Sequence, residues 1–182
     1  KGDWKQRKLG QAFSERKEKS SSGNLLSVTI ANGVVRAESL DRKDNSSKDK
    51  SNYRCVRIGD IAYNSMRMWQ GASGVSLFNG IVSPAYTVLV PKENINPVFF
   101  AAIFKHPTMI QIFRANSQGL TSDTWNLKYR ELKHIMVNVP TIHEQITISH
   151  LLQILDHIIA LHQNKMTALK SIKTSLLQKL FV

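Results

Sequence analysis

From Thr141 to Val182 the sequence contains no glycine or proline, and its apolar residues return in a seven-residue pattern. Thr141 and Glu144 have the spacing of a capping box, in which a hydroxyl and a carboxylate three residues later satisfy backbone N–H groups at the start of a helix. Alternating steps of four and three residues from Ile148 meet apolar side chains at eight of ten positions, as in a coiled coil. We therefore predict one long helix of about 38 residues and roughly 57 Å. Its predicted helix–helix interface comprises Ile148, Leu152, Leu155, Ile159, His162, Met166, Leu169, Lys173, Leu176 and Leu180.

We call these ten positions the seam. The predicted helix is too long to bury the whole seam against a domain of ~140 residues, whose radius of gyration should be about 14 Å. We therefore expect a partner helix, either in a homodimer or in a pair with a second domain-bearing half. His162 and Lys173 interrupt the seam. His162 is interpreted as a residue that sets register or partner, and Lys173 either does the same or extends its ammonium group from the seam into solvent. Self-association through residues 145–180 is the expected result. The alternative is an amphipathic helix that packs back on its own chain.

Residues 1–140 show a different pattern, in which short β-branched runs alternate with turn residues. Asn32-Gly33 predicts a tight hairpin turn, and Asn96-Pro97 predicts a helix N-cap followed by proline at the first helical position. We expect an α+β domain of short twisted strands and small helices over 1–140, followed by the long C-terminal helix over 141–182. The expected strands are 25–30, 34–36, 53–58, 61–63, 85–90 and 135–139, and the expected helices begin at Pro97 and Pro107.

The charge of the chain points to an anionic partner. Lysine and arginine outnumber aspartate and glutamate by 25 to 13, which gives a formal net charge of +12, and +10 of it lies in residues 1–140. A single cysteine, Cys55, excludes an intrachain disulfide framework and fits a reducing compartment. The longest apolar run, from Val98 to Phe104, is far shorter than the ~20 residues that span a bilayer. We expect a cytoplasmic, basic protein with no membrane segment, and nucleic acid is the first candidate partner.

The sequence offers no catalytic set. His143, His150 and His157 recur every seven residues, so neighbours lie ~10.5 Å apart along a helix, too far to bind one metal ion. Only three acidic residues occur between positions 61 and 140, and no phosphate-binding Gly-rich loop is present. Ser83-Pro84-Ala85-Tyr86 lacks the second proline and the leading amide or acid of the methyltransferase element that it faintly resembles. We expect no catalytic residues, no metal and no cofactor.

Several motifs in order along the chain resemble one known family. They are Trp4 with Lys8-Leu9-Gly10, the stretch IAYNSMRMWQGASG from Ile61 to Gly74, Gly80-Ile81-Val82-Ser83-Pro84-Ala85-Tyr86, Glu131-Leu132-Lys133 with Val137-Asn138-Val139-Pro140, and His143-Glu144-Gln145-Ile146 at the start of the long helix. Together they are similar to a target-recognition domain and conserved spacer helix of the type I restriction-modification specificity subunits. The resemblance covers nearly the whole chain.

The resemblance implies that the chain recognises a DNA sequence and does not itself catalyse a reaction. A complete specificity subunit carries two recognition domains, each reading one half of a bipartite double-stranded DNA site, and two long helices that hold them apart. Methyltransferase (modification) subunits and a restriction subunit bind to that scaffold. This chain has one recognition domain and one helix, so it is interpreted as a half subunit or a C-terminal half.

Candidate DNA contacts lie in polar or basic segments, because phosphate contacts need cations and base contacts need hydrogen-bonding side chains. The interpretation of the segment from Ser117 to Lys128 as a reading loop competes with a capped turn that Trp125 anchors. Two other functions stay open: a coiled-coil assembly adaptor with only non-specific nucleic-acid binding, and a DNA-modifying enzyme. The candidates are Arg16, Lys17, Lys19, Lys43, Lys48, Lys50, Arg67, Gln70, Ser117, Gln118, Thr121, Ser122, Asp123, Thr124, Lys128 and Arg130.

Overall fold

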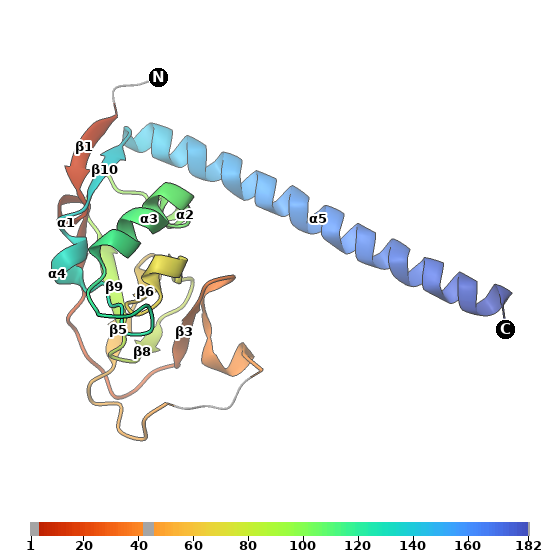
Figure 1. The fold of residues 1–182 in the computed structure, drawn as a ribbon, viewed down its shortest axis with the longest axis horizontal. Helices are drawn as coiled ribbons and strands as arrows, with labels where there is room; N and C mark the ends of the chain where they lie inside the picture. The colour runs from red at the N-terminus through yellow and green to blue at the C-terminus, as the bar shows by residue number, and fades with distance from the viewer. Residues whose placement is uncertain (1–3, 42–45, 182) are drawn as a thin grey trace. The chain divides into compact units, whose positions relative to one another are not determined.

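A computed structural model describes residues 4–41 and 46–181 of the chain (Figure 1). The chain divides into two compact units, Lys1–Gln145 and Ile146–Val182. The first unit mixes short strands with short helices, and the second consists of helix, so the expected α+β class with one long C-terminal helix is confirmed. The strands are β1 Lys5–Lys8, β2 Phe13–Glu15, β3 Leu26–Thr29, β4 Gly33–Arg36, β5 Arg54–Val56, β6 Ile61–Asn64, β7 Ser73–Val75, β8 Gly80–Val82, β9 Tyr86–Pro91 and β10 Met136–Val139. The helices are α1 Leu9–Ala12, α2 Pro97–Phe104, α3 Pro107–Asn116, α4 Tyr129–Leu132 and α5 Ile142–Leu180, with 3₁₀ turns η1 Ala37–Ser39 and η2 Met68–Gln70.

The two ends of the first unit are joined by the pair β1–β10, which lie side by side in Figure 1. The strands are antiparallel, with Lys5 opposite Val139, and the ladder continues where the Leu9 amide donates to the carbonyl of Ile135 at 2.9 Å. Gly10 follows, and a Cβ there would lie 2.9 Å from the Cβ of Lys133. The Lys8-Leu9-Gly10 motif therefore serves this closure, since Leu9 is fully buried and Gly10 permits the close approach of the two segments.

The centre of the unit is a four-stranded antiparallel sheet in the order β2-β9-β6-β7. Ala62 of β6 lies opposite Val88 of β9, and both side chains are fully buried. They join a cluster that also holds Leu26, Val28, Val34, Val56 and Val82 from the two-stranded pairs β3–β4 and β5–β8. Because side chains alternate along a strand, Ile61 and Leu89 occupy the opposite face of the sheet, and they too are fully buried.

The hairpin β3–β4 packs its turn directly onto β7. A Cβ at Gly74 would lie 2.8 Å from the Cα of Gly33, so the two backbones touch where neither residue has a side chain. Thr29 is opposite Gly33, and three residues, 30–32, connect the strands. The expected hairpin is present, but its tight turn at Asn32-Gly33 is wrong in detail, because Gly33 (φ 62°) is the first residue of β4.

The helices α2 and α3 form where proline and cap signals predict them. The side-chain oxygen of Asn96 accepts hydrogen bonds from the amides of Val98 and Phe99, and Pro97 occupies the first turn. Pro107 then starts α3, and five phenylalanine rings link these helices to β2 through edge-on and tilted contacts with centroids 4.9–6.2 Å apart. Such aromatic burial dominates the packing of this part of the core.

Helix α5 starts with the predicted capping box. The Thr141 amide donates to Oε2 of Glu144 at 3.0 Å, and the Glu144 amide donates back to the Thr141 hydroxyl at 3.3 Å. Gln145, which is 1% exposed, receives a hydrogen bond from the Asn96 amide and donates to the carbonyls of Asn94 and Pro140. The beginning of α5 is thereby fixed to the end of β10 and to the N-cap of α2. None of the helices in the described part of the chain is long and apolar enough to cross a membrane.

The apolar side chains of α5 are exposed along most of its length in the single chain. On the predicted seam, Leu155 is 46% exposed and Ile159 53%. A second strip lies one residue before the seam and includes Leu151, Ile154, Ile158, Leu161 and Ile172, which are 43–57% exposed. Neighbouring residues on a helix differ by about 100°, so the two strips together make a broad apolar face.

Candidate nucleic-acid interface

Two segments that are far apart in sequence meet at a pair of tryptophans. Trp69 belongs to the turn η2, Trp125 belongs to the segment between α3 and α4, and their rings make an edge contact with centroids 5.2 Å apart. The indole N–H of Trp69 donates to the carbonyl of Met66, and the Leu127 amide donates to the carbonyl of Ser65 at 2.8 Å. We call residues 65–70 and 114–130 the tryptophan-centred surface. It brings Arg67 and Gln70 together with the predicted segment from Ser117 to Lys128.

Arg114 adds a cation to this junction. It lies in the last turn of α3, is exposed, and holds its guanidinium 5.0 Å from the centre of the Trp125 ring. A guanidinium stacked on an indole keeps its edge N–H donors available for an anion such as a phosphate. Sequence reasoning missed Arg114. The signal was present, since Arg114 is the basic residue at the end of an apolar helix directly before the polar segment.

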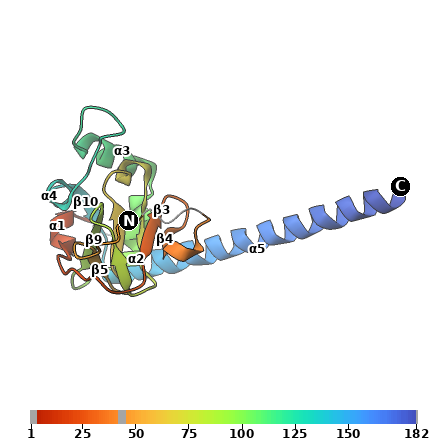
Figure 2. The same cartoon turned by 90° about the horizontal axis from the view of Figure 1, so that it is seen from below.

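The segment between α3 and α4 is a closed loop that extends from the edge of the domain in Figure 2. Gln118 and Asn126 exchange backbone hydrogen bonds of 3.0 and 2.8 Å at its neck. Further out, the Thr124 amide donates to the carbonyl of Thr121, and the Thr121 amide donates to Oγ1 of Thr124. We call residues 117–126 the hairpin loop. It is a capped turn with a half-buried Trp125, and Gln118, Thr121, Ser122, Asp123 and Thr124 are exposed on it. That these side chains read DNA stays a prediction.

Several cations belong to the tryptophan-centred surface beside the hairpin loop. Arg67, Lys128 and Arg130 are exposed, and Arg130 is the only one of these three with an ion-pair partner in the described structure, to Glu131 at 2.7 Å. Ser117 donates its hydroxyl to the carbonyl of Phe113, so it caps α3 from within the chain. With Arg114, this surface carries four exposed cations around one exposed acid, Asp123.

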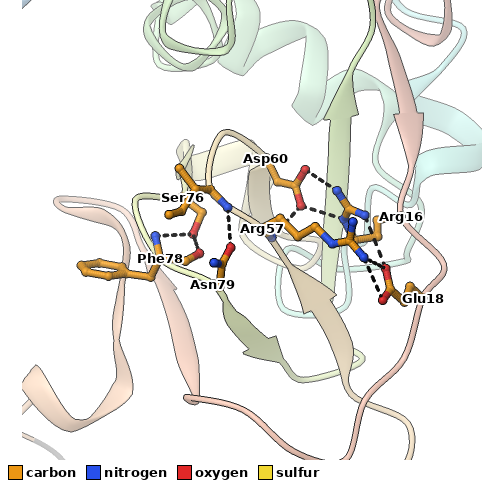
Figure 3. A network of polar contacts seen from close by, with 8 residues as sticks. Arg16, Glu18, Arg57, Asp60, Ser76, Phe78 and Asn79 are labelled. Carbon is orange, nitrogen blue, oxygen red and sulfur yellow. Dashed lines mark hydrogen bonds and ion pairs between the residues drawn. The ribbon is translucent and has the colours of Figure 1, made fainter.

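Arg16 has a different environment from the one that the sequence suggested. Its Nε and Nη2 donate to the two carboxylate oxygens of Asp60 at 2.7 and 2.8 Å, and its side chain is only 14% exposed (Figure 3). Asp60, 2% exposed, also accepts from the Arg57 amide, and Arg57 pairs with Glu18. The hydrogen bond to Asp60 is the main reason that the pKa of Arg16 is raised. Because these donors are already engaged within the domain, we leave Arg16 out of the proposed DNA contacts.

The remaining basic candidates lie in the segments around Tyr53 and β5, which are separate in sequence from the two segments of the tryptophan-centred surface. Lys19 donates to the side-chain oxygen of Asn52 at 2.8 Å, while Lys17 and Lys48 are exposed. Lys50 is half-buried, and its carbonyl accepts from the Tyr53 amide. Lys43 lies outside the described residues.

Two side chains that carry nucleophilic groups, Cys55 and Tyr63, have raised pKa values, mainly because of burial. Cys55 lies in β5, where burial is the main reason that the pKa of its thiol is raised, so it is protonated at neutral pH. Tyr63 is fully buried, and desolvation raises the pKa of its hydroxyl. In residues 4–41 and 46–181, no group of three or more histidine, cysteine, aspartate or glutamate residues has an arrangement that would hold a metal ion.

Comparison with known proteins gives a consistent result. The family model described as the type I restriction modification DNA specificity domain matches residues 1–171. A putative type I restriction enzyme specificity subunit of Methanocaldococcus jannaschii is 23% identical over 147 residues, which are 76% of this chain and 34% of that protein. The chain therefore spans about a third of the length of this curated relative.

Solved structures show the same fold. The HsdS subunit from Thermoanaerobacter tengcongensis matches with a TM-score of 0.57 and 13% identity, over 87% of this chain and 38% of that one. The S subunit of the type I restriction-modification system from M. genitalium matches with a TM-score of 0.54 and 16% identity, over 99% of this chain and 46% of that one. Since the family model covers nearly the whole sequence, this chain belongs to the family of type I restriction-modification DNA specificity domains.

Proposed function

We propose that this chain is a non-catalytic module that reads one half of a bipartite target in double-stranded DNA for a type I restriction-modification enzyme. The observation that carries the proposal is the tryptophan-centred surface, where Trp69 and Trp125 join η2 to the hairpin loop. Cations and hydrogen-bonding side chains are exposed together there. Sequence reading needs both, since phosphate contacts set affinity and position, and base-edge contacts set specificity.

Individual residues of this surface have distinct proposed roles. Arg67, Arg114, Lys128 and Arg130 contact phosphates, because they are exposed cations around the loop. Gln70 and Gln118 have the amide geometry that pairs with adenine, and Asp123 accepts a hydrogen bond from cytosine. Lys17, Lys19, Lys48 and Lys50 supply a second basic region for the DNA backbone.

The second part of the proposal assigns α5 to assembly. Its two apolar strips are wider than the single seam that a two-stranded coiled coil requires. The seam through Leu155 and Ile159 pairs with a second helix of the same kind, in a homodimer or with another specificity half. The strip through Leu151 and Ile158 receives the modification subunits, and through them the restriction subunit.

The experiment is selection of bound sequences from a random duplex library, by the chain alone and by the chain with the modification subunits of its own system. We expect a consensus split by a fixed gap, in which each half is read by one recognition domain. Isologous pairing of α5 further predicts that the homodimer selects a palindromic version of that consensus.

Two outcomes contradict the proposal. Binding without any consensus, with or without modification subunits, would indicate an assembly adaptor with non-specific affinity for nucleic acid. Methyl transfer or strand cleavage by the purified chain alone, with S-adenosylmethionine and Mg²⁺ present, would indicate an enzyme. A salt titration belongs to the same series, because phosphate contact requires the logarithm of the affinity to fall linearly with the logarithm of salt concentration.

A further inference from the structure

Leu120 is the most exposed large apolar residue in the described part of the chain. Its side chain is fully exposed, whereas Leu77, in the turn between β7 and β8, is 71% exposed. A single exposed leucine needs no explanation by itself. Leu120 differs because it lies in the hairpin loop, between the neck formed by Gln118–Asn126 and the turn formed by Thr121–Thr124.

The hairpin loop holds Leu120 outward by its own backbone. Gly119, directly before it, has φ +142°, and a Cβ there would lie 2.6 Å from the carbonyl oxygen of Thr124. Only glycine tolerates both this dihedral angle and this approach. The close approach of Gly119 to Thr124 and the hydrogen bonds between Thr121 and Thr124 together fix the direction in which the chain turns at Leu120. The leucine therefore projects from a turn whose backbone is held on both strands.

The base of the loop is anchored to the core. The Ser117 hydroxyl bonds to the end of α3, Trp125 packs against Trp69, and Leu127, two residues after Trp125, is fully buried. Arg114 precedes the neck in sequence and lies over Trp125, and Lys128 follows the neck directly after Leu127; both are exposed. Two antiparallel chain segments form that neck, and a two-stranded ribbon fits the DNA major groove, which is about 12 Å wide. In a duplex the phosphates lie outside and the base edges lie deeper in the groove. The cations at the base of the loop are therefore placed for phosphates, and the apolar residue farther out is placed for base edges.

We propose that Leu120 is the apolar base contact of the hairpin loop and determines part of the DNA specificity. Its side chain enters the groove and packs against base edges, while Arg114 and Lys128 bind the flanking phosphates. The apolar group that base edges offer in the major groove is the thymine methyl group. This inference rests on the proposed function, because it requires the tryptophan-centred surface to face DNA.

The test compares Leu120→Ser with Leu77→Ser, a matched loss of an exposed leucine outside the loop. The probes are the duplex selected by the wild-type chain and a scrambled duplex of equal base composition. We expect Leu120→Ser to weaken binding to the selected duplex about tenfold, the size of one lost base contact. Affinity for the scrambled duplex and the salt dependence should not change, because no charge is removed. Leu77→Ser should bind both duplexes as the wild type does.

A second arm identifies the contacted group. Deoxyuridine replaces each thymidine of the selected duplex in turn, which removes one methyl group at a time. We expect one position at which the replacement weakens the wild-type chain and leaves Leu120→Ser unaffected. Equal affinity of Leu120→Ser and wild type for the selected duplex, or the absence of any such thymine, would overturn the inference. A wild-type chain that shows no preference for any duplex would instead overturn the proposed function, so the two failures are distinguishable.

Discussion

Arg16 and Asp60 form a two-point ion pair across 44 positions of sequence, with Nε and Nη2 of the arginine 2.7 and 2.8 Å from the two carboxylate oxygens. The pair joins the segment that leaves β2 to the turn before β6, and Asp60 also accepts the Arg57 amide at 2.8 Å (Figure 3). A buried carboxylate with three donors is satisfied, whereas one that loses its arginine retains an uncompensated charge. The contact is therefore structural, and it removes a cation from the surface that the sequence alone would offer to DNA.

Arg16→Met should destabilise the domain strongly. Loss of one partner from a buried pair costs about 3–5 kcal/mol, which for a domain of this size lowers the melting temperature by roughly 10 °C. Lys17→Met is the matched control, because Lys17 is exposed and should change stability by no more than about 0.5 kcal/mol. Thermal unfolding followed by circular dichroism measures both. Equal melting temperatures for the two variants would contradict the structural role of the pair.

Arg114→Gln and Lys128→Gln should each weaken DNA binding in the same way on all sequences. Each variant removes one proposed phosphate contact, so the slope of log affinity against log salt should fall by about 0.9. Lys92→Gln is the control, because the Lys92 ammonium bonds to the carbonyl of Gly10 and Lys92 belongs to neither segment of the tryptophan-centred surface. Fluorescence anisotropy with labelled duplex at four salt concentrations gives the slopes. An unchanged slope in both variants would exclude these residues from the phosphate contacts.

Leu155→Asp should prevent self-association through α5. Leu155 lies near the middle of the seam and is 46% exposed in the single chain, so a partner helix would bury it and a carboxylate would oppose that burial. Gln153→Asp introduces the same residue off both apolar strips and controls for the lower helix propensity of aspartate. Sedimentation at tens of micromolar should give a dimer for the wild type and Gln153→Asp, and a monomer for Leu155→Asp. A monomeric wild type would refute pairing of identical chains.

Ile158→Asp separates the second strip of α5 from the seam. It should leave the dimer intact, because Ile158 lies outside the seam positions, and it should weaken the binding of modification subunits. Co-purification with those subunits measures the effect, and Gln153→Asp again serves as control. Loss of the dimer with retention of the modification subunits would reverse the assignment of the two strips.

The capping box of α5 should be visible in the titration of Glu144. Hydrogen bonds from the Thr141 amide, the largest cause, and from its hydroxyl hold the pKa of the Glu144 carboxyl below its ordinary value. The folded state therefore favours the carboxylate, and this contribution to stability is present at neutral pH and lost as the pH falls through the lowered pKa. Carbon-detected NMR titration measures it, with Glu144→Gln to assign the resonance. Thr141→Val should raise the pKa toward its ordinary value, and a normal pKa in the wild type would contradict the cap.

Local signals in the sequence were sufficient for the elements that depend on local chemistry. Asn96-Pro97 and Pro107 set the starts of α2 and α3, and the capping box and the heptad pattern without glycine or proline set α5. The segments at the N-terminal edge carried no such signal. The sequence did not predict the strands β1 and β2 or the short helix α1 between them. β1 has four exposed polar residues, and the two strands exist only because they pair with distant partners, β1 with β10 and β2 with β9.

In the candidate interface, too, the sequence indicated the residues and the tertiary structure decided which of them lie together. Charge and residue type indicated Arg67, Gln70 and the segment from Ser117 to Lys128, but could not indicate that Trp69 and Trp125 bring these segments together. Residue type alone cannot distinguish Arg16 from Arg114 as a candidate DNA contact, because both are arginines. Tertiary structure decided that Arg16 is engaged by Asp60 while Arg114 lies exposed over Trp125.

The sequence by itself determined the fold class, the family and the long amphipathic helix, because these follow from composition, ordered motifs and a periodic pattern of apolar side chains. Only the tertiary structure decided which polar residues are available to DNA. Whether a polar side chain is free to contact DNA depends on contacts between residues 44 to 56 positions apart in the chain. Asp60 engages Arg16, and the contact of Trp69 with Trp125 brings two polar segments together. No pattern of neighbouring residues encodes such pairings, since they form only when the sheet and the two helices pack around the shared core.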